Sequence, residues 1–316
     1  MPLPPVKDAY SGRVNEMTLG GGDRKSVTIG GAKTIPHGGD REATGHKPVI
    51  AIDVLDAAPE EWPPVLAEAY ADVLDDPAAW ARKAVEEFGA ELVCVKFDGI
   101  HPDKGDRGAP HAVEVAGKVL DAVDVPIILW GSGNPDKDNA VMPKVSEAAK
   151  GQNVLLGTVT EDNYKNLTAI SLADGHFLIS EAPLDINIAK QVNILVSDMG
   201  FPLERMVMFQ TTGALGYGLE YAYSLQERQR LAALGGDRLM AMPLICDVGN
   251  EAWRAKEAKT SGDDVPEWGD AAQRGPLWEA TTAIALLQSG VDIVRMRHPK
   301  AVATVQAYIK GLWGDA

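Results

Sequence analysis

The stretch that decides the fold runs from residue 177 to residue 210 and reads FLISEAPLDINIAKQVNILVSDMGFPLERMVMFQ. It begins and ends with short apolar runs, residues 177–180 and 206–210, which are typical of buried strands. Between them lies a stripe of apolar side chains at the spacing of one helix face, formed by Ile188, Val192, Leu195 and Met199. Asp185 is typical of a residue that begins a helix, and Gly200 of one that ends it. The stretch therefore predicts a strand, a helix and a second strand.

The same alternation extends over the rest of the chain from about residue 48. Further apolar runs occupy residues 49–54, 92–97, 125–130, 154–159, 239–246 and 292–296. Continuous apolar runs of this length suit strands that are buried on both faces, as in a parallel sheet. Pro126 stands where a strand can begin, whereas Pro243 lies inside its run and weakens the prediction of a strand there.

Two of the intervening helices carry clear signals of their own. One follows a predicted N-cap, Asp76, and ends at Gly89, and its apolar stripe consists of Trp80, Ala84, Val85 and Phe88. The last helix has a stripe formed by Val302, Val305 and Ile309. These helices fill the gaps between apolar runs, so that strands and helices alternate along the chain.

Eight strands, each followed by a helix, within residues 48–316 predict an α/β protein with a (β/α)₈ TIM-barrel domain. A doubly wound sheet is the competing fold, but the G-x-G-x-x-G turn expected after its first strand is absent, because Val-Leu-Asp-Ala-Ala-Pro follows Asp53. Residues 1–47 form an N-terminal extension, in which the Gly-rich stretches 18–22 and 27–31 predict a β-hairpin that plugs or borders one end of the barrel. Residues 249–275 form a long polar loop after the seventh strand, on the C-terminal face.

Composition excludes several classes of function. Thirty basic and 45 acidic side chains give a net charge of -15, which disfavours non-specific binding to nucleic acid or to anionic lipid. No apolar run approaches the roughly 18 residues that span a membrane, and residues 1–8 do not resemble a signal peptide. We therefore expect a cytoplasmic protein. Cys94 and Cys246 lie in separate apolar runs and are expected to be buried thiols, too few for an iron–sulfur cluster.

Polar residues gather where the predicted strands end, which is where TIM barrels bind their ligands. They are Asp53, Asp98, Gly99, residues 131–134, residues 158–161, Glu181, residues 210–212, residues 247–250, Arg295, Arg297 and His298. These amides, hydroxyls and carboxylates suit hydrogen bonding to a large polar heterocycle. The alternative is that several of them only cap the following helices, and for Asp53 and Thr160 the sequence leaves both interpretations open.

Specific catalytic arrangements are weakly supported. Only His298 among six histidines is placed at a strand end, so no metal site is predicted, and the G-x-S-x-G elbow is absent. Lys96 is a candidate for a Schiff base, but an ion pair with a carboxylate of a neighbouring strand is the expected use. Arg295 and Arg297 either bind a phosphate or pair with the acidic rim. The glycines of residues 212–218 either admit a ligand or only form a tight turn.

The strand ends in their order along the chain resemble one known family. The resemblance rests on residues 48–53, 94–98, 129–134 and 210–218 together with the N-terminal Gly-Gly hairpin, and it covers essentially the whole chain. It is to the small (delta) subunit of the corrinoid/iron–sulfur protein of the acetyl-CoA (decarbonylase/synthase) pathway. That resemblance implies a barrel similar to pterin-dependent methyltransferases, without catalytic residues of its own.

The resemblance also implies partners and a cofactor. A large subunit would carry the [4Fe–4S] cluster and the cobalamin domain, and the corrinoid would lie between that domain and the mouth of this barrel. A methyltransferase, acetyl-CoA synthase and a reductive activator would bind transiently. The chain lacks the cobalamin-ligand pattern D-x-H-x-x-G, since its nearest stretch, which contains Asp174 and His176, has no glycine at the last position. The resemblance therefore implies that the partner holds most of the cofactor.

We place the corrinoid contact at three segments that follow the third, sixth and seventh strands. The predicted contact residues are Gly131, Ser132, Gly133, Asn134, Gln210, Thr211, Thr212, Gly213, Gly216, Asp247 and Asn250. Two alternatives stay open: a free-standing methyltransferase that holds a pterin with Asp98 and Asn134, and an aldol-type or sugar-phosphate barrel that uses Lys96. Aromatic residues predicted either to anchor the partner subunit or to pack against the barrel's own helices are Trp62, Tyr217, Tyr221, Tyr223 and Trp268.

Overall fold

The computed structural model describes residues 9–36 and 43–314. The prediction that residues 1–8 are not a signal peptide concerns residues outside the described ranges. The same holds for His37, one of the histidines for which no metal site is predicted. Eight parallel strands close into a barrel in the order β10-β3-β4-β5-β6-β7-β8-β9, with Ile293 of β10 beside Val49 of β3. The strands are β3 (Val49–Leu55), β4 (Leu92–Lys96), β5 (Ile127–Trp130), β6 (Leu155–Val159), β7 (Phe177–Ala182), β8 (Met206–Gln210), β9 (Leu244–Cys246) and β10 (Ile293–Met296). The predicted TIM barrel is confirmed.

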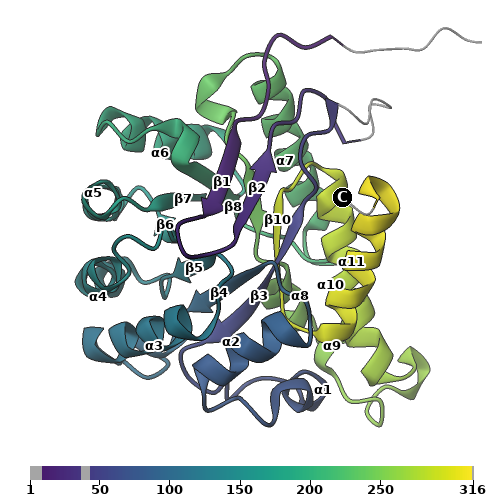
Figure 1. The fold of residues 1–316 in the computed structure, drawn as a ribbon. Helices are drawn as coiled ribbons and strands as arrows, with labels where there is room; N and C mark the ends of the chain where they lie inside the picture. The colour runs from purple at the N-terminus through teal and green to yellow at the C-terminus, as the bar shows by residue number, and fades with distance from the viewer. Residues whose placement is uncertain (1–8, 37–42, 315–316) are drawn as a thin grey trace, which may run out of the picture.

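Helices surround the barrel (Figure 1). They are α1 (Pro64–Ala67), α2 (Pro77–Glu86), α3 (Ala109–Ala122), α4 (Pro135–Ala148), α5 (Tyr164–Asp174), α6 (Ile186–Asp198), α7 (Leu219–Leu234), α8 (Val248–Arg254), α9 (Lys256–Lys259), α10 (Ala271–Gln288) and α11 (Pro299–Trp313). Asp76 caps α2 by accepting hydrogen bonds from the backbone of Ala78 and Ala79, and Asp185 caps α6 in the same way. Within the described residues, no helix is both long enough and apolar enough to cross a bilayer.

Two details differ from the sequence predictions. The run 239–246 forms a strand only from Leu244, because Pro243 has no backbone N–H to give to the sheet and the preceding residues make a 3₁₀ turn, Arg238–Met240. In α6 the buried face is centred on Ala189, Val192 and Val196, so Ile188 and Leu195 lie at the edges of the stripe rather than at its centre. Neither difference alters the order of the elements.

The predicted hairpin closes one end of the barrel. Strands β1 (Glu16–Gly20) and β2 (Ser26–Gly30) pair antiparallel and lie across the barrel in Figure 1. Leu19 and Ile29 are buried in one cluster with interior residues of the barrel strands. In the turn between β1 and β2, Arg24 donates hydrogen bonds to the carbonyls of Leu120 and Val123 just before β5. These contacts place the hairpin at the N-terminal end of the strands, opposite the ligand-binding end of such barrels.

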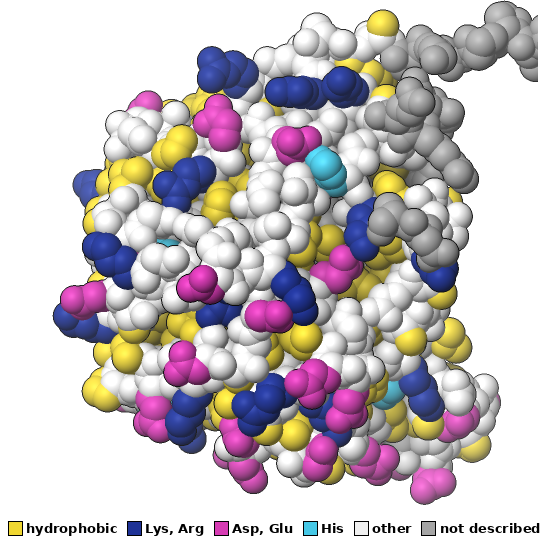
Figure 2. All heavy atoms as spheres, viewed as in Figure 1, with side chains coloured by type: hydrophobic (Ala, Val, Ile, Leu, Met, Phe, Trp, Pro, Cys, Tyr) yellow, Lys and Arg dark blue, Asp and Glu magenta, His cyan; other side chains and the backbone are white. Residues whose placement is uncertain are grey.

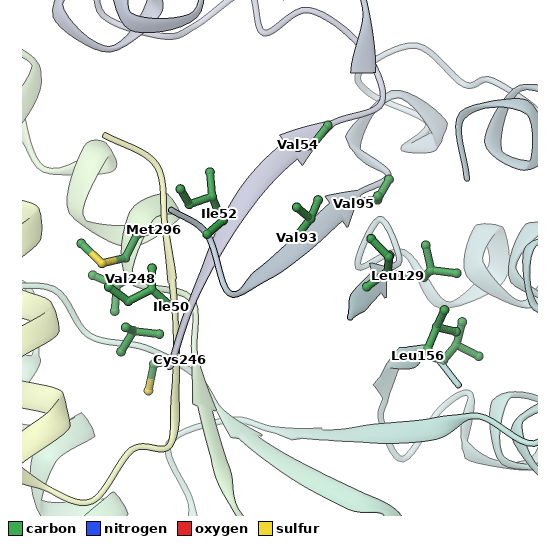
Figure 3. Close-up of a cluster of buried hydrophobic side chains, with 14 of the residues drawn as sticks. Ile50, Ile52, Val54, Val93, Val95, Leu129, Leu156, Cys246, Val248 and Met296 are labelled. Atoms are coloured by element: carbon green, nitrogen blue, oxygen red, sulfur yellow. The ribbon is translucent and has the colours of Figure 1, made fainter. Parts of the chain in front are cut away.

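Two apolar layers follow from the alternation of side chains along each strand. One set fills the barrel interior and includes Val49, Leu92, Ile128, Ile179 and Phe209. The other set packs against the helices, and Figure 3 shows part of it, with Ile50, Ile52 and Val54 along β3 and Val93 and Val95 along β4. A strand residue therefore points inward or outward according to its parity, which decides what each strand end can contact.

The segment after β9 is long, as predicted, but it is largely helical rather than an open loop. It contains α8, α9 and a 3₁₀ turn, Pro266–Trp268. Arg274 of α10 fixes this segment by donating hydrogen bonds to the carbonyls of Glu257, Thr260 and Gly269. Trp253 and Ala258 are buried in the same apolar cluster as the helix-facing side chains of the barrel strands, so the segment packs onto the main core, which composition alone did not reveal.

On the face seen in Figure 2, basic and acidic side chains are interspersed. The described residues of this face do not gather Lys and Arg into a continuous stripe. Binding along a nucleic-acid backbone needs such a stripe, and the net charge of -15 opposes it as well.

Candidate functional site

The C-terminal ends of the strands bring one ring of side chains into the barrel mouth. Every second residue of a strand points into the barrel, so counting on from the interior residues identifies the inward-pointing side chains at the strand ends. We call this set the mouth layer, and it consists of Asp53, Lys96, Trp130, Glu181, Phe209, Asp247 and Arg295. Most of these residues are charged, whereas the layer beneath is apolar. Because barrels of this type bind their ligands at this end, the mouth layer is the candidate site.

Arg295 is the centre of the mouth layer and is fully buried. Its Nη2 lies 2.9 Å from Oδ1 of Asp53, and its Nη1 lies 3.3 Å from Oδ2 of Asp247. Burial alone would lower the pKa of Arg295, but the carboxylates of Asp247 and Asp53 outweigh it and hold that pKa above the usual range. The Nε of Arg297 lies 3.0 Å from the other oxygen of Asp53. Both arginines are thus paired with carboxylates, which decides the question that the sequence left open and assigns Asp53 to ion pairing rather than capping.

Two aromatic rings support this charged network. The Cζ of Arg295 lies 4.0 Å from the centroid of the Trp130 ring. Phe209 meets Trp130 edge to face, with 4.9 Å between the ring centroids and 75° between the planes. A guanidinium over an indole face is a favourable contact for a desolvated cation. The rings therefore give the buried guanidinium an aromatic contact within the mouth layer.

Lys96 is held between the ends of β4 and β5. Its Nζ donates a hydrogen bond to the carbonyl of Gly131 and lies 3.7 Å from Oδ1 of Asp98. The expected partner was a carboxylate of a neighbouring strand, so this expectation was wrong in detail: the ion pair is with a residue just beyond β4. Burial would raise the pKa of Asp98, but Lys96 and Lys104 hold it below its usual value.

Two carboxyl groups of the mouth layer, those of Glu181 and Asp247, have fewer favourable contacts to offset the cost of burying their charge. Burial raises the pKa of Glu181, which accepts a hydrogen bond from Thr158, and within residues 9–36 and 43–314 it forms no ion pair. Burial also raises the pKa of Asp247, against the opposing effect of Arg295, and its Oδ1 has no hydrogen-bond partner in the described part of the chain. Asp247 is buried, whereas Glu181 is partly exposed and can accept hydrogen bonds from N–H or O–H groups of a ligand.

The predicted contact segment after β5 is shaped by a buried carboxylate, Asp138. Oδ1 of Asp138 accepts hydrogen bonds from the backbone N and the hydroxyl of Ser132, both at 2.8 Å, and Oδ2 accepts one from the backbone of Gly133. A Cβ on Gly131 would lie 2.6 Å from Oδ2 of Asp138, so glycine is required there. Asn134 caps α4, because its Oδ1 accepts from the backbone N of Lys137 at 3.0 Å. Ser132, Gly133 and Asn134 remain accessible at the mouth.

In the segment after β8, Gln210 faces the helix layer, whereas Thr212 contacts the end of the neighbouring strand β9. Gln210 has outward parity, and its amide donates to Gln229 of α7, away from the mouth. The hydroxyl of Thr212 accepts a hydrogen bond of 2.9 Å from the backbone N of Asp247, and so joins the ends of β8 and β9. Thr211 is exposed beside them, and its hydroxyl donates to the carbonyl of Ala182.

Glycines shape the same loop, and Asn250, on α8 beyond β9, contacts the charged network. Gly213 packs directly against the backbone of Gly218, which leaves no room for a side chain, and Gly216 has a φ of +75°. Oδ1 of Asn250 accepts a hydrogen bond of 3.2 Å from Arg297. The structure thus brings Thr212, Asp247 and Asn250 together and leaves Gln210 against the helix layer.

Sequence reasoning missed a second histidine at this end of the barrel. Nε2 of His111, at the start of α3, lies 3.1 Å from Oδ2 of the buried Asp56, and Oδ1 of Asp56 accepts from the backbone N of Gly99 at 2.7 Å. Asp56 lies just beyond β3, but a sequence does not show which distant helix start will face it. The prediction placed only His298 at a strand end, and His111 escaped it because it lies at a helix start rather than at a strand end.

His298 itself is occupied by structural contacts. Its Nδ1 accepts a hydrogen bond from the backbone N of Lys300, and its ring stacks on Trp253 with 5.7 Å between centroids. Burial lowers the pKa of His298 to about 4. Among the residues that the structure describes, no group of three His, Cys, Asp or Glu side chains is arranged to hold a metal ion.

Both thiols are buried, as predicted. Cys94 lies in the barrel interior, and Cys246 faces α7, where the amide of Gln226 lies 2.9 Å from its sulfur. Burial raises the pKa of Cys246 to about 12 and that of Cys94 further. Both thiols are therefore protonated near neutral pH.

The aromatic candidates separate into two groups. Trp62 packs against Tyr70 and Trp80, with centroids 6.0 and 5.5 Å away, and Tyr223 is half-buried beside α10. Tyr217, Tyr221 and Trp268 keep 49, 67 and 38 % of their surface exposed. The first group serves the barrel's own packing, and the second is available to a partner.

The residues of the mouth layer that the contact prediction omitted were detectable by parity. Val49 and Ala51 point inward, so Asp53 does as well, and the same counting yields Lys96, Trp130, Glu181 and Arg295. The contact prediction instead selected loop residues that combine small and amide side chains. Counting in steps of two along each strand would have separated Gln210 from Asp247.

Comparisons with known proteins agree on a family. The family model described as CO dehydrogenase/acetyl-CoA synthase delta subunit matches residues 16–265. The chain is 39 % identical over 325 residues to the acetyl-CoA decarbonylase/synthase complex subunit delta of Archaeoglobus fulgidus, covering 98 % of this chain and 71 % of that protein. It is 40 % identical over 300 residues to the subunit of the same name from Methanothermobacter thermautotrophicus, covering 95 % of this chain and 75 % of that protein.

Solved structures with the same fold are dihydropteroate synthases. The enzyme of Xanthomonas albilineans with 4-aminobenzoic acid has a TM-score of 0.57 at 12 % identity and covers 88 % of this chain and 98 % of its own. The Yersinia pestis enzyme with a pterine-sulfa conjugate has a TM-score of 0.55 at 14 % identity, and the match covers 84 % of this chain and 93 % of that enzyme. At this identity the likeness concerns the fold alone. The sequence matches, by contrast, extend over most of the chain, and they show that it belongs to the CO dehydrogenase/acetyl-CoA synthase delta-subunit family.

Proposed function

We propose that this chain is the small subunit of a heterodimeric corrinoid/iron–sulfur methyl carrier. Its barrel mouth covers the cobalamin of a large partner subunit while a methyl group passes from methyl-tetrahydropterin to acetyl-CoA synthase. Membership of a family whose relatives are named as complex subunits supports an assembly of this kind. A methyltransferase, acetyl-CoA synthase and a reductive activator are the transient partners in this proposal, and the cytoplasm is its location.

The observation that carries the proposal is the internal pairing of the mouth layer. Arg295 and Arg297 are paired with Asp53, and Arg295 also with Asp247, so these charges hold one another rather than a reacting group. The rim around them presents hydroxyls, amides and glycines. Such a surface can cover a flat macrocycle and bond to its edge without acting as an acid, a base or a nucleophile.

The residues of the mouth fit a covering role better than a holding role. His298 is committed to α11 and Trp253, and His111 is paired with Asp56, so neither described histidine of the mouth is positioned as a ligand for cobalt. When bound, the corrinoid supplies the metal that carries the methyl group. The chain's part is to exclude water and to orient the ring edge, and the accessible residues for this are Ser132, Gly133, Asn134, Thr211, Gly216 and Asn250.

Burial divides the predicted contact residues. Gly131, Gln210, Thr212, Gly213 and Asp247 are buried in the described structure. In this proposal they act indirectly: Gly131 gives room to Asp138, and Thr212 joins the ends of two strands. The accessible group named above makes the direct contact with the corrinoid.

A second candidate is a pterin-dependent methyltransferase that acts on its own. The observation that favours it is Glu181, an inward-facing carboxyl that forms no ion pair with the described residues and can accept hydrogen bonds from a nitrogen heterocycle. The Yersinia pestis enzyme of the same fold was solved with a pterine-sulfa conjugate. In that case the chain alone would bind methyl-tetrahydropterin in the mouth.

Reconstitution of the chain with the large subunit distinguishes the two candidates. Ser132→Trp places bulk on the accessible rim and should slow methyl transfer, followed by the cobalamin absorbance, by about tenfold or more. Thr18→Trp, on the exposed face of the hairpin at the other end of the barrel, is the matched control and should leave the rate unchanged. Stoichiometric binding of methyl-tetrahydrofolate by the isolated chain, with methyl transfer to added free cobalamin, would overturn the covering role and support the second candidate.

A further inference from the structure

A groove lies beside the barrel mouth, between the loop after β8 and the first turns of α10. It has a volume of about 340 Å³, and its walls include Leu215, Trp268, Gln273, Leu277 and Trp278. We call it the rim groove. The loop after β8 and the segment after β9 both leave the C-terminal ends of their strands, so the rim groove lies at the same end of the barrel as the mouth layer.

The rim groove exposes apolar side chains that the barrel does not use. Leu277 keeps 57 % and Trp268 38 % of its surface exposed. Tyr217 and Tyr221, from the loop after β8 and the start of α7, do not line the groove but are more exposed still than Trp268. Single exposed apolar residues are common on proteins, but a group of them around a hollow marks a binding surface.

The walls of the rim groove are fixed by contacts within the chain. Arg274 donates to the carbonyls of Glu257, Thr260 and Gly269, and its guanidinium lies 5.6 Å from the centroid of the Trp268 ring. On the other wall, Nε1 of Trp278 donates to the carbonyl of Leu215 at 3.0 Å. The hollow is therefore formed before any partner arrives, which lowers the entropic cost of binding.

The surroundings of the groove are acidic. Asp263, Asp264, Glu267 and Asp270 fall within eight residues of sequence beside Trp268. The basic side chain nearest to them in the groove, Arg274, is occupied by three carbonyls. An occupant should therefore offer an apolar side chain with Lys or Arg residues around it. A second copy of this chain, with its net charge of -15, is a poor match by charge.

We propose that the rim groove is a docking site for the corrinoid-bearing large subunit, which inserts an apolar side chain flanked by basic residues. This inference rests on the proposed function. Family relatives are complex subunits, so a protein partner of this chain is expected. The groove also lies at the same end of the barrel as the mouth, and its wall residue Leu215 belongs to the loop that carries Thr211 and Gly216. A partner whose cofactor lies over the mouth would reach the groove without rearrangement.

The test measures the affinity of the full-length chain for the purified large subunit by isothermal titration calorimetry. Leu277→Glu and Trp268→Glu should each raise the Kd by about tenfold or more, because central apolar anchors dominate such interfaces. Leu231→Glu is the matched control, since Leu231 is also exposed, at 43 %, but lies on α7 outside the groove. It should change the Kd less than about twofold. Circular dichroism melting of all three variants checks that the fold is kept.

Charge provides an independent measurement. The double variant Asp263→Lys with Asp264→Lys should weaken binding and reduce its dependence on salt concentration, because rim charges act through screened attraction. Wild-type affinity in both Leu277→Glu and Trp268→Glu would overturn the proposal. So would sedimentation that shows the wild-type chain self-associating through this groove, since a second copy would then be the occupant.

The test of the docking site can succeed or fail independently of the test of the covering role. At large-subunit concentrations well above the raised Kd, Leu277→Glu should transfer methyl groups at the wild-type rate, while Ser132→Trp stays slow. If Ser132→Trp is slow and both groove variants bind normally, the docking site is wrong and the covering role stands. If the groove variants bind weakly and Ser132→Trp transfers at the normal rate, the docking site stands and the covering role fails.

Discussion

The guanidinium of Arg295 stacks on the indole of Trp130, with 4.0 Å from its Cζ to the ring centroid. On its edges the same guanidinium meets Asp53 and Asp247. The fully buried arginine is therefore in contact with one aromatic ring and two carboxylates. Because an unpaired buried charge would be very unfavourable, these residues must be present together, and the mouth layer behaves as one unit.

Replacing the central arginine should destabilise the barrel strongly. Arg295→Met removes the cation and leaves the carboxylates of Asp53 and Asp247 buried with less compensation. We expect a loss of about 3–5 kcal/mol in the free energy of unfolding, measured by urea denaturation. Arg228→Met, at an exposed position on α7, is the control and should change stability by less than about 0.5 kcal/mol. A loss of similar size in both variants would contradict the central role of Arg295.

Glu279 of α10 should make the protein less stable as the pH rises. It is fully buried, and burial raises its pKa to about 7, although it accepts hydrogen bonds from the backbone of Arg297 and His298 and from Trp253. An unfolded glutamate has a pKa of about 4.3, so between these values the folded state binds more protons than the unfolded state. Stability is then highest below about pH 4.3 for this group and is lost as the pH rises toward 7.

The measurement is the difference in unfolding free energy between wild type and Glu279→Gln from pH 4.5 to 7.5. As the pH rises across this window, the wild type should lose a few kcal/mol of unfolding free energy relative to Glu279→Gln. The exposed Glu220→Gln, at the start of α7, should give a flat difference. A flat difference for Glu279→Gln as well would show that this carboxyl is ionised over the whole range.

His298, which is adjacent to Glu279, should have the opposite pH dependence. Burial lowers its pKa to about 4, while an unfolded histidine has a pKa of about 6.5. The unfolded state binds more protons in this window, so the stability that His298 contributes is lost as the pH falls from about 6.5 toward 4. His298→Asn keeps an acceptor for the backbone of Lys300 but does not titrate. Thermal melts of both proteins at pH 5 and 7.5 test this, and a constant difference between them would contradict it.

The hairpin should contribute to folding as part of the core. Ile29→Ala empties a fully buried position between β2 and the barrel interior, and large-to-small changes at such sites cost about 2–5 kcal/mol. Thr28→Ala, at the adjacent position, loses a hydrogen bond of 3.0 Å to Thr18 on the exposed face and should cost about 1 kcal/mol or less. Denaturation followed by tryptophan fluorescence measures both. Equal effects would mean that the hairpin only rests on the barrel.

The chain expressed alone should retain neither iron nor zinc. Its two thiols are buried on opposite sides of the barrel wall, and burial raises the pKa of Cys246 to about 12. Elemental analysis by plasma mass spectrometry should find far less than one metal ion per chain. Cys94→Ala with Cys246→Ala is the control, which should give the same result. Stoichiometric metal that disappears in the double variant would contradict this prediction.

The sequence by itself determined the architecture of this protein. Apolar runs alternating with helical stripes predicted the barrel, because a parallel strand is buried on both faces and each connecting helix on one. Caps such as Asp76 and Asp185 were predictable because their hydrogen bonds involve residues only two or three positions away. The hairpin and the burial of both cysteines followed from equally local patterns.

Only the tertiary structure decided what the site residues contact. Asp53 and Arg295 are 242 residues apart and meet because β10 closes the barrel against β3. The pairing of Asp56 with His111, the contact of Gln210 with α7 and the order of the segment after β9 depend on which distant elements lie opposite. Burial then sets the ionisation of Glu279 and His298. These properties depend on desolvation and on non-local packing, which the pattern of residues along the chain does not contain.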